Sequence, residues 1–360
     1  MPLILSGDTG VPVTTVTGTL PVANGGTGGA SNFTGFKNRI INGAMVIDQR
    51  NAGASVTPTN NQYTLDRWTE SLAQTSKLTI QQSATAPTGF ASSLLVTSSS
   101  AYSVLTGDNF NVLQWIEGYN TADLAWGTAS AATVTLSFWV RSSLTGTFGG
   151  SIVNNNQNYS YPFSYTISVA NTFEYKTITI AGPTAGTWSN TTTTRNIGIW
   201  IGLGAGASAS GTAGAWAATG YYNATGAVSV VGTNGATFYV TGVQLEVGST
   251  ATSFEYRPYG TELALCQRYY EIGVTGYHGD ITNTGTYGSY PQFSVTKRAA
   301  PTITFGSVTI EVTTGTFNSD TPSVGTRFST TVRDFNATKL AIGSSGDRGW
   351  NAPYYATSEL

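Results

Sequence analysis

The stretch Ile197-Gly-Ile-Trp-Ile-Gly-Leu203 decides the fold class. Its odd-numbered positions are large and apolar, whereas the even-numbered positions around them are Asn196, Gly198, Trp200 and Gly202. Successive side chains of a β-strand point to opposite faces, so this alternation predicts a strand with one face in a hydrophobic core.

The same alternation recurs elsewhere in the chain. In residues 134–141 the apolar set is even-numbered, and the strand that begins at Phe238 also has an even-numbered set. Beyond Gly242 the apolar positions become Val243, Leu245 and Val247. A change from even to odd positions turns the side chains over, so a β-bulge is predicted at or near Gly242.

Short apolar runs separated by many glycines and prolines predict an all-β protein in three parts. Residues 1–35 are rich in glycine and form either a flexible linker or a segment that becomes ordered on attachment to other chains. Residues 36–260 are predicted to form a β-sandwich, with one short helix at 121–126. Residues 261–360 are predicted to form a second, small β-sandwich that closes the chain.

In this last part, Thr261 is a suitable N-cap for a helix that runs to Tyr270. Strands are predicted to follow at 293–296, 301–305 and 308–312.

The composition excludes several classes of function. Charged residues make up only 9% of the chain, the net charge is -2, and the sixteen basic residues are scattered, so nucleic-acid binding is not expected. No run approaches the ~20 apolar residues of a spanning helix, so membrane insertion is not expected either. The N-terminus lacks the basic region of a signal peptide, which indicates synthesis in a cytoplasm without export by that route.

Catalytic chemistry also finds little support. His278 and Cys266 are the single His and Cys, so neither a zinc site nor a Ser/His/Asp arrangement is expected, and no metal, cofactor or catalytic residue is assigned. Cys266 is interpreted as a buried packing residue. A glycan-cleaving enzyme would need a pair of carboxylates, but no pattern selects a pair among Asp66, Glu70, Asp108, Glu117 and Glu174. Asp66 and Arg67 are interpreted as a structural ion pair or cap.

Aromatic side chains are the best candidates for binding, because sugars stack on the rings of Trp and Tyr. The Gly-, Ala- and Ser-rich stretch 205–235 is predicted to be a long loop or hairpin, and a second uncharged stretch spans 276–290. Together they supply the candidate glycan-binding residues Trp216, Tyr221, Tyr222, Tyr277, Tyr287 and Tyr290. The alternative is that these rings pack between subunits. Trp115, Trp126 and Trp139 are assigned to the core.

Several motifs resemble those of bacteriophage tail fibres. The segments 2–10 (PLILSGDTG) and 20–28 (LPVANGGTG) are similar to the N-terminal segments of such fibres. Six further segments resemble parts of the carbohydrate-binding jelly-roll domains of fibres: Lys37–Met45, Asp48–Arg50, Tyr63–Trp68, Leu136–Arg141, Val243–Gly248 and Phe254–Pro258. The C-terminal tip domains that often follow them are resembled by Cys266–Tyr270, Lys297–Thr302 and Tyr355–Leu360.

The resemblance implies a jelly-roll sandwich, an extended N-terminal segment that attaches to other virion proteins, and a homotrimer in the virion. It also implies a receptor-binding role at the distal tip, but not the identity of the receptor. Host surface polysaccharide or lipopolysaccharide is the partner expected for the aromatic candidate residues. The chain lacks the long repetitive shaft of large fibres. Two alternatives therefore stay open: a head, neck or tail decoration protein that binds no receptor, and a glycan depolymerase.

Overall fold

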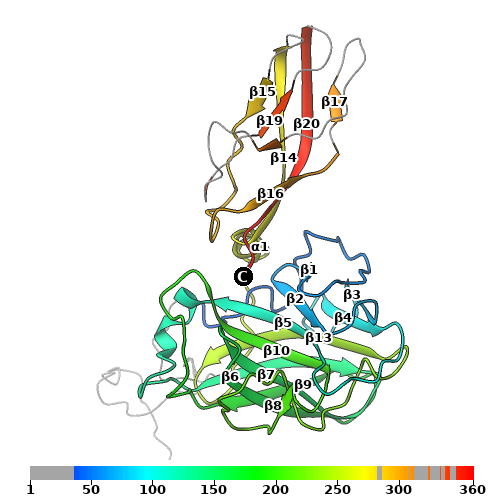
Figure 1. Ribbon diagram of the computed structural model, residues 1–360, viewed down its shortest axis with the longest axis vertical. Coiled ribbons are helices and arrows are strands. Elements are labelled where there is room, and N and C mark those ends of the chain that lie inside the picture. Colours follow the sequence, from blue (N-terminus) through cyan, green and yellow to red (C-terminus); the bar gives the residue numbers. More distant parts are fainter. Residues whose placement is uncertain are drawn as a thin grey trace, which may run out of the picture.

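The structure is a computed structural model that describes residues 36–281, 286–307, 309–311, 323–324, 333, 337–340 and 346–360; the predicted segment 1–35 lies outside them. The larger part of the chain is a sandwich of two antiparallel sheets, from which a narrower β tip projects (Figure 1). The predicted all-β sandwich class is confirmed. Among the described residues, no helix has the length and apolar character needed to span a membrane.

The first sheet of the sandwich has six strands. In spatial order they are β1 (Tyr63–Leu65), β2 (Trp68–Leu72), β5 (Asn109–Glu117), β10 (Arg195–Ala205), β7 (Gly146–Asn154) and β8 (Ser160–Ile167). The stretch 197–203 lies within β10, which pairs with β5 on one side and with β7 on the other. It is therefore a central strand, and one of its faces lies against the second sheet.

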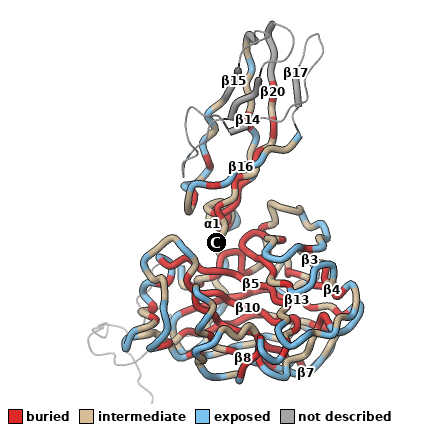
Figure 2. The backbone as a smooth tube through the Cα atoms, viewed as in Figure 1, coloured by how far each residue is buried: buried red, intermediate tan, exposed pale blue. Residues whose placement is uncertain are grey.

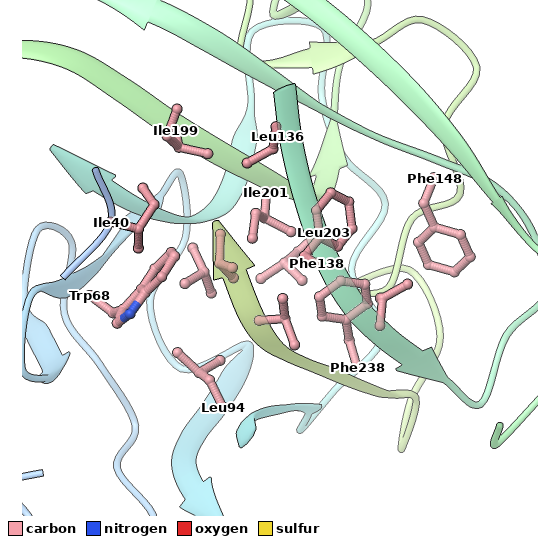
Figure 3. Close-up of a cluster of buried hydrophobic side chains, with 14 of the residues drawn as sticks. Ile40, Trp68, Leu94, Leu136, Phe138, Phe148, Ile199, Ile201, Leu203 and Phe238 are labelled. Atoms are coloured by element: carbon pink, nitrogen blue, oxygen red, sulfur yellow. The ribbon is translucent and has the colours of Figure 1, made fainter. Parts of the chain in front are cut away.

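The second sheet has five strands. In spatial order they are β3 (Leu78–Ser83), β4 (Ser93–Ser98), β13 (Thr237–Val247), β6 (Val134–Ser142) and β9 (Glu174–Ile180). Figure 3 shows Ile199, Ile201 and Leu203 of β10 in one cluster with Phe138 of β6 and Phe238 of β13. All of these side chains are buried, and removing their apolar surface from water is the main force that holds the two sheets together.

The predicted β-bulge at Gly242 is confirmed. The pairing of β13 with β6 passes from Thr241 opposite Trp139 to Gln244 opposite Ser137, so β13 holds one extra residue there. Gly242 has a φ of 61°, and a Cβ at this position would come within 2.7 Å of the Phe90 ring. Glycine is the residue that accepts both conditions.

The predicted helix at 121–126 is replaced by two short 3₁₀ turns, η3 (Gly118–Asn120) and η4 (Ala122–Leu124). Ala125 adopts a left-handed conformation with a φ of 49°, which ends η4 before an α-helix can form.

The predicted long loop 205–235 folds back over the outer face of the first sheet. Within it, β11 (Ser210–Gly211) and β12 (Asn223–Ala224) form a short parallel pair. The side chain of Asn223 lies directly above Gly202 of β10 and Gly149 of β7, where a Cβ would come within 2.4 Å and 2.3 Å of its atoms. Glycines on the outer face thus let the loop lie close to the sheet.

One helix, α1 (Tyr259–Gln267), joins the sandwich to the tip. It begins two residues before the predicted N-cap, because the carbonyl oxygen of Pro258 accepts hydrogen bonds from the backbone N–H groups of Thr261 and Glu262. It ends before Tyr270, where the next strand starts. Cys266 is buried on this helix, as predicted.

The described residues of the tip form a four-stranded and a three-stranded sheet. The first consists of β14 (Tyr270–Ile281), β20 (Gly346–Thr357), β16 (Thr302–Phe305) and β17 (Thr309–Glu311), and the second of β15 (Thr286–Ser289), β19 (Ala337–Leu340) and β18 (Ser323–Val324). The strand predicted at 293–296 does not form. Instead, Phe293 packs in the small core of the tip, and Ser294 donates hydrogen bonds to the buried carboxylate of Glu271.

The chain returns from the tip to the sandwich after β20. Figure 2 shows buried segments continuing from the sandwich through α1 to the base of the tip. Glu359 lies between Arg50 and Arg67 of the sandwich and pairs with both. Next to this pair, Glu117 at the end of β5 accepts hydrogen bonds from Arg268 and Tyr269, and the Tyr269 ring lies against Arg67. Buried ion pairs therefore connect the two parts.

Candidate functional site

The candidate site lies on the outer face of the six-stranded sheet, the face turned away from the core. On β10 this face consists of the even-numbered positions, where Trp200 stands between Gly198 and Gly202. A Cβ at residue 198 would lie 2.7 Å from Nε1 of Trp200 and 2.8 Å from the ring of Trp115 on the neighbouring strand β5. Glycine at 198 is therefore what lets these two large rings lie close to the backbone of the sheet.

Three aromatic rings form the floor and one wall. The rings of Trp115 and Trp200 meet edge to face, with centroids 6.1 Å apart and an interplanar angle of 89°. The ring of Tyr222 lies over Trp200 at 4.6 Å and 33°. Tyr222 belongs to the loop 205–235, and its backbone N–H donates to the carbonyl oxygen of Ala209, which holds the loop in this position.

Beside these rings is a polar cleft of about 490 Å³. This volume is in the range of small-ligand sites, roughly 300–1,000 Å³. The side chains around the rings are mostly neutral hydrogen-bonding groups: Asn60, Asn61, Tyr63, Thr69, Ser71, Asn109 and Gln157. Leu113, Leu360 and Arg195 complete the lining, so it contains no Asp or Glu side chain.

Two buried polar side chains on this outer face have no hydrogen-bond partner among the described residues. The Nε1–H of Trp200 is one, although only 4% of this residue is exposed. The amide of Asn111 is the other: it is fully buried between the lining residues Asn109 and Leu113 on β5, and neither Nδ2 nor Oδ1 is bonded. Unsatisfied buried groups cost ~1–3 kcal/mol each.

Arg195, the first residue of β10, supplies the charge of the lining. Its guanidinium group lies over the Trp115 ring, 4.7 Å from the centroid. Its Nε–H donates to Oδ1 of Asn155 at 2.9 Å. Partial burial raises the pKa of Tyr222, and the nearby charge of Arg195 acts in the opposite direction. The cation thus stands beside the aromatic floor.

The residues that follow the last strand of the tip, at its base, contribute to the same cleft. Leu360 packs with Leu113, Trp115 and Trp200, and its carbonyl oxygen accepts a hydrogen bond of 2.8 Å from the hydroxyl of Tyr63. Because the neighbouring Glu359 is held by Arg50 and Arg67, the position of Leu360 depends on the docking of the tip. The cleft is therefore built jointly by the sandwich and by a segment more than a hundred residues further along the chain.

The structure separates the aromatic residues that were predicted to bind glycans. Tyr222 lies in the cleft, and Tyr221 lies next to it with its ring against Gly211. Trp216 lies elsewhere: its ring packs among Trp126, Trp188, Tyr159 and Tyr161, and its Nε1–H donates to the carbonyl oxygen of Ala181 at 2.8 Å.

The other three predicted residues belong to the tip. Tyr277 is half-buried against the small core of the tip, and Tyr290 is 60% exposed. The backbone of Tyr287 lies in β15, whereas its side chain lies outside the described residues. The tip tyrosines are thus not part of the cleft.

The roles of two cleft residues, Trp115 and Trp200, were not recognised from the sequence. Trp115 is buried as predicted, but it lies in a cluster on the outer face, apart from the core between the sheets. Trp200 was noted only as an outward-facing position of its strand. The signal that could have identified it is its isolation between two glycines, since a lone large ring on the outer face of a central strand has no neighbour on that strand to cover it.

The carboxylates considered for catalysis all have structural partners. Glu117 binds Arg268 and Tyr269, Glu174 pairs with Lys176, and Asp108 accepts from the hydroxyl of Tyr102. Glu70 is buried and accepts from Thr64. Asp66 and Arg67 were interpreted as a structural ion pair or cap, and they do not pair with each other: Asp66 accepts from the backbone and side chain of Gln49, and Arg67 pairs with Glu359. Among the described residues, no group of His, Cys, Asp and Glu could hold a metal ion.

A second hollow, of about 180 Å³, lies where the segment after β13 meets the chain near Phe90. Phe90, Phe254 and Tyr256 line it, and Arg257 is its cation. The amino groups of Arg257 are occupied by Glu255, Glu262 and backbone oxygens. This hollow is smaller than the cleft, and its one arginine is already paired with the two carboxylates of the lining, Glu255 and Glu262.

Comparison with known proteins gives likenesses at low similarity. No family model and no curated protein sequence matches the chain. Among solved structures, the enzymatically active domain of tailspike protein 4 of bacteriophage CBA120 is 16% identical with a TM-score of 0.30; the match covers 53% of this chain and 21% of that one.

Two carbohydrate-binding modules match over nearly their whole length. The family 11 module from Clostridium thermocellum, solved with a mixed-linked tetrasaccharide, is 11% identical with a TM-score of 0.27, over 56% of this chain and 99% of that one. The xylan-binding family 22 domain from Paenibacillus barcinonensis is 8% identical with a TM-score of 0.28, over 56% and 99%. At these scores, the function of the chain must be inferred from its own residues.

Proposed function

We propose that the chain is an adhesion protein that binds saccharides in the cleft on the outer face of the six-stranded sheet. The observation that carries the proposal is the combination of an aromatic floor, Trp115, Trp200 and Tyr222, with a rim of amides and hydroxyls. Sugar rings present apolar C–H faces that stack on aromatic rings and hydroxyls that bond to amides.

The cleft favours binding over cleavage. Hydrolysis of a glycosidic bond ordinarily needs two carboxyl groups on either side of it. The lining contains no Asp or Glu side chain, and the carboxylates considered above are engaged elsewhere. A glycan depolymerase is therefore the less favoured alternative.

We further propose that the protein is a fibre subunit of a bacteriophage virion, a tail fibre or receptor-binding protein, whose saccharide is a host surface polysaccharide or lipopolysaccharide. The ordered fibre-like motifs from residue 2 to residue 360 support this role. A homotrimer, attached through residues 1–35, fits the exposed apolar side chains of Ile272 and Val274 on β14, which are 37% and 68% exposed.

A glycan array tests the binding proposal, with cell adsorption as a second readout. We expect wild-type protein to bind a defined set of glycans, and Tyr222→Ala to weaken binding about tenfold, since a lost ring contact is worth ~1 kcal/mol or more. The matched control is Tyr290→Ala on the tip, which should bind like wild type.

The reverse result would move the site to the tip, where Tyr277, Tyr287 and Tyr290 were predicted to bind. If wild-type protein binds no glycan and no host cell, the decoration-protein alternative is favoured. Release of reducing ends from a bound polysaccharide would favour the depolymerase.

A further inference from the structure

Arg195 makes no ion pair with the described residues, and it lies at the edge of a cleft whose other lining side chains carry no charge. None of the described carboxylates lies within ion-pair distance of it. The carboxylate opposite it in the strand register, Glu117, is bound by Arg268 and Tyr269. The other acid near the cleft, Glu359, is held between Arg50 and Arg67.

The orientation of Arg195 is set by two contacts that leave its outer edge available. Its guanidinium plane rests over the Trp115 ring at 4.7 Å, and its Nε–H is bonded to Asn155 at 2.9 Å. Neither of its terminal amino groups makes a hydrogen bond to the described residues. A guanidinium held in this way keeps two parallel N–H donors, which match the two oxygens of a carboxylate or phosphate.

We infer that the cleft recognises an acidic saccharide, whose carboxylate or phosphate pairs with the two terminal amino groups of Arg195 while a neighbouring sugar ring stacks on Tyr222, the partly exposed ring that covers Trp200. This inference rests on the proposed saccharide-binding function and specifies the class of ligand. A neutral glycan would leave the charge of Arg195 in the cleft without a partner. An acidic glycan supplies that partner, so the cleft discriminates between the two.

The opposite face of the sandwich offers a matched control. Arg141 on β6 also stacks on an aromatic ring, with its guanidinium carbon 4.9 Å from the centroid of Tyr239. It lies on the five-stranded sheet and does not line the cleft. Arg141→Gln therefore removes the same charge from the protein without touching the proposed site.

The test measures affinities for pairs of oligosaccharides that differ only in their charge. Suitable probes are oligogalacturonate, oligoglucuronate, oligomannuronate and a sialic acid oligomer, each with its carboxyl-reduced counterpart, and a phosphorylated oligosaccharide with its dephosphorylated counterpart. Calorimetric titration is carried out on the full chain as wild type, Arg195→Gln, Arg195→Lys and Arg141→Gln. The carboxylate and phosphate pairs show which of the two groups is recognised.

We expect the best-bound probe to be acidic, and to bind about ten- to a hundredfold more tightly than its neutral counterpart, as charge-assisted hydrogen bonds contribute. Arg195→Gln should abolish that difference, Arg195→Lys should retain part of it because the charge stays but the fork is lost, and Arg141→Gln should preserve it. The preference should weaken as salt is added.

Two results overturn the inference and leave the saccharide site intact: equal binding of acidic and neutral partners by wild type, or an acid preference that survives in Arg195→Gln. If wild-type protein binds none of these probes, and also no glycan on the array, both the inference and the proposed function fail.

Discussion

Replacement of Glu359 by Gln tests how the tip is held against the sandwich. The carboxylate accepts from Arg67, whose side chain is only 1% exposed, and from Arg50 at 2.7 Å. Arg67 is fixed further by its bond of 2.6 Å to the carbonyl oxygen of Trp115 and by the Tyr269 ring, 3.6 Å below its guanidinium carbon. Burial alone lowers the pKa of Arg67, but Glu359 and its neighbours raise it above its ordinary value, so the arginine stays charged.

The burial of this ion pair determines how much stability Glu359→Gln should lose. Gln has nearly the shape of Glu but no charge, so Arg67 keeps its other contacts and loses its counter-ion in a place that water does not reach. Removing one partner of a buried ion pair costs about 3–5 kcal/mol of the free energy of unfolding. The position of Leu360 in the cleft should loosen at the same time.

Urea unfolding of the full chain, followed by tryptophan fluorescence, measures the change. Asp123→Asn is the control: Asp123 also pairs with an arginine, Arg39, but its side chain is 42% exposed, so about 1 kcal/mol or less is expected. Proteolysis near α1 should become faster in Glu359→Gln and stay unchanged in Asp123→Asn. Equal small losses in both variants would refute the view that a buried ion pair docks the tip.

Three further predictions concern the cleft, pH and assembly. Gly198→Ala should lower the free energy of unfolding by about 1–3 kcal/mol and weaken saccharide binding, because its Cβ would displace the rings of Trp115 and Trp200. Gly260 has open space around it, so Gly260→Ala should change neither the thermal denaturation of the protein nor its titration with saccharide. Burial raises the pKa of Asp66 from 3.8 to about 6, so the folded state binds this proton more tightly than the unfolded state. As the pH falls from 7 to 4, the free energy of unfolding of wild type should therefore rise by up to about 3 kcal/mol relative to that of Asp66→Asn, and this gain should be lost as the pH rises through 6. A pH series of urea unfolding curves that shows no such trend would contradict this. Light scattering should give about three times the chain mass of 37.6 kDa, whereas a monodisperse monomer would exclude the trimer.

The parts of the fold that could be predicted from sequence are those with local periodicity. The alternation in 197–203 identified a central strand, and the switch of apolar positions after Gly242 identified the bulge that the pairing of β13 with β6 shows. Helix ends were less predictable, because the carbonyl of Pro258 and the left-handed Ala125 decide them.

The site could be predicted only in part, because it depends on pairings between distant residues. Tyr222 was identified from its loop, but its contact with Trp200 requires that loop to fold back across glycines on two strands. Trp115 reads as a core residue until β10 is known to lie beside β5. The pairing of Arg67 with Glu359 joins residues 292 positions apart, which no local pattern reveals.

Fluorine NMR of protein labelled with fluorotryptophan tests the central claim most directly, that saccharides bind on the outer face of the six-stranded sheet. The chain has eight tryptophans, and Trp→Phe variants assign their signals. Titration with the best-bound saccharide from the array should shift the signals of Trp115 and Trp200, while those of Trp126 in the core and Trp350 in the tip stay in place. Unchanged Trp115 and Trp200 signals at saturation, with a shift of Trp350 instead, would contradict it.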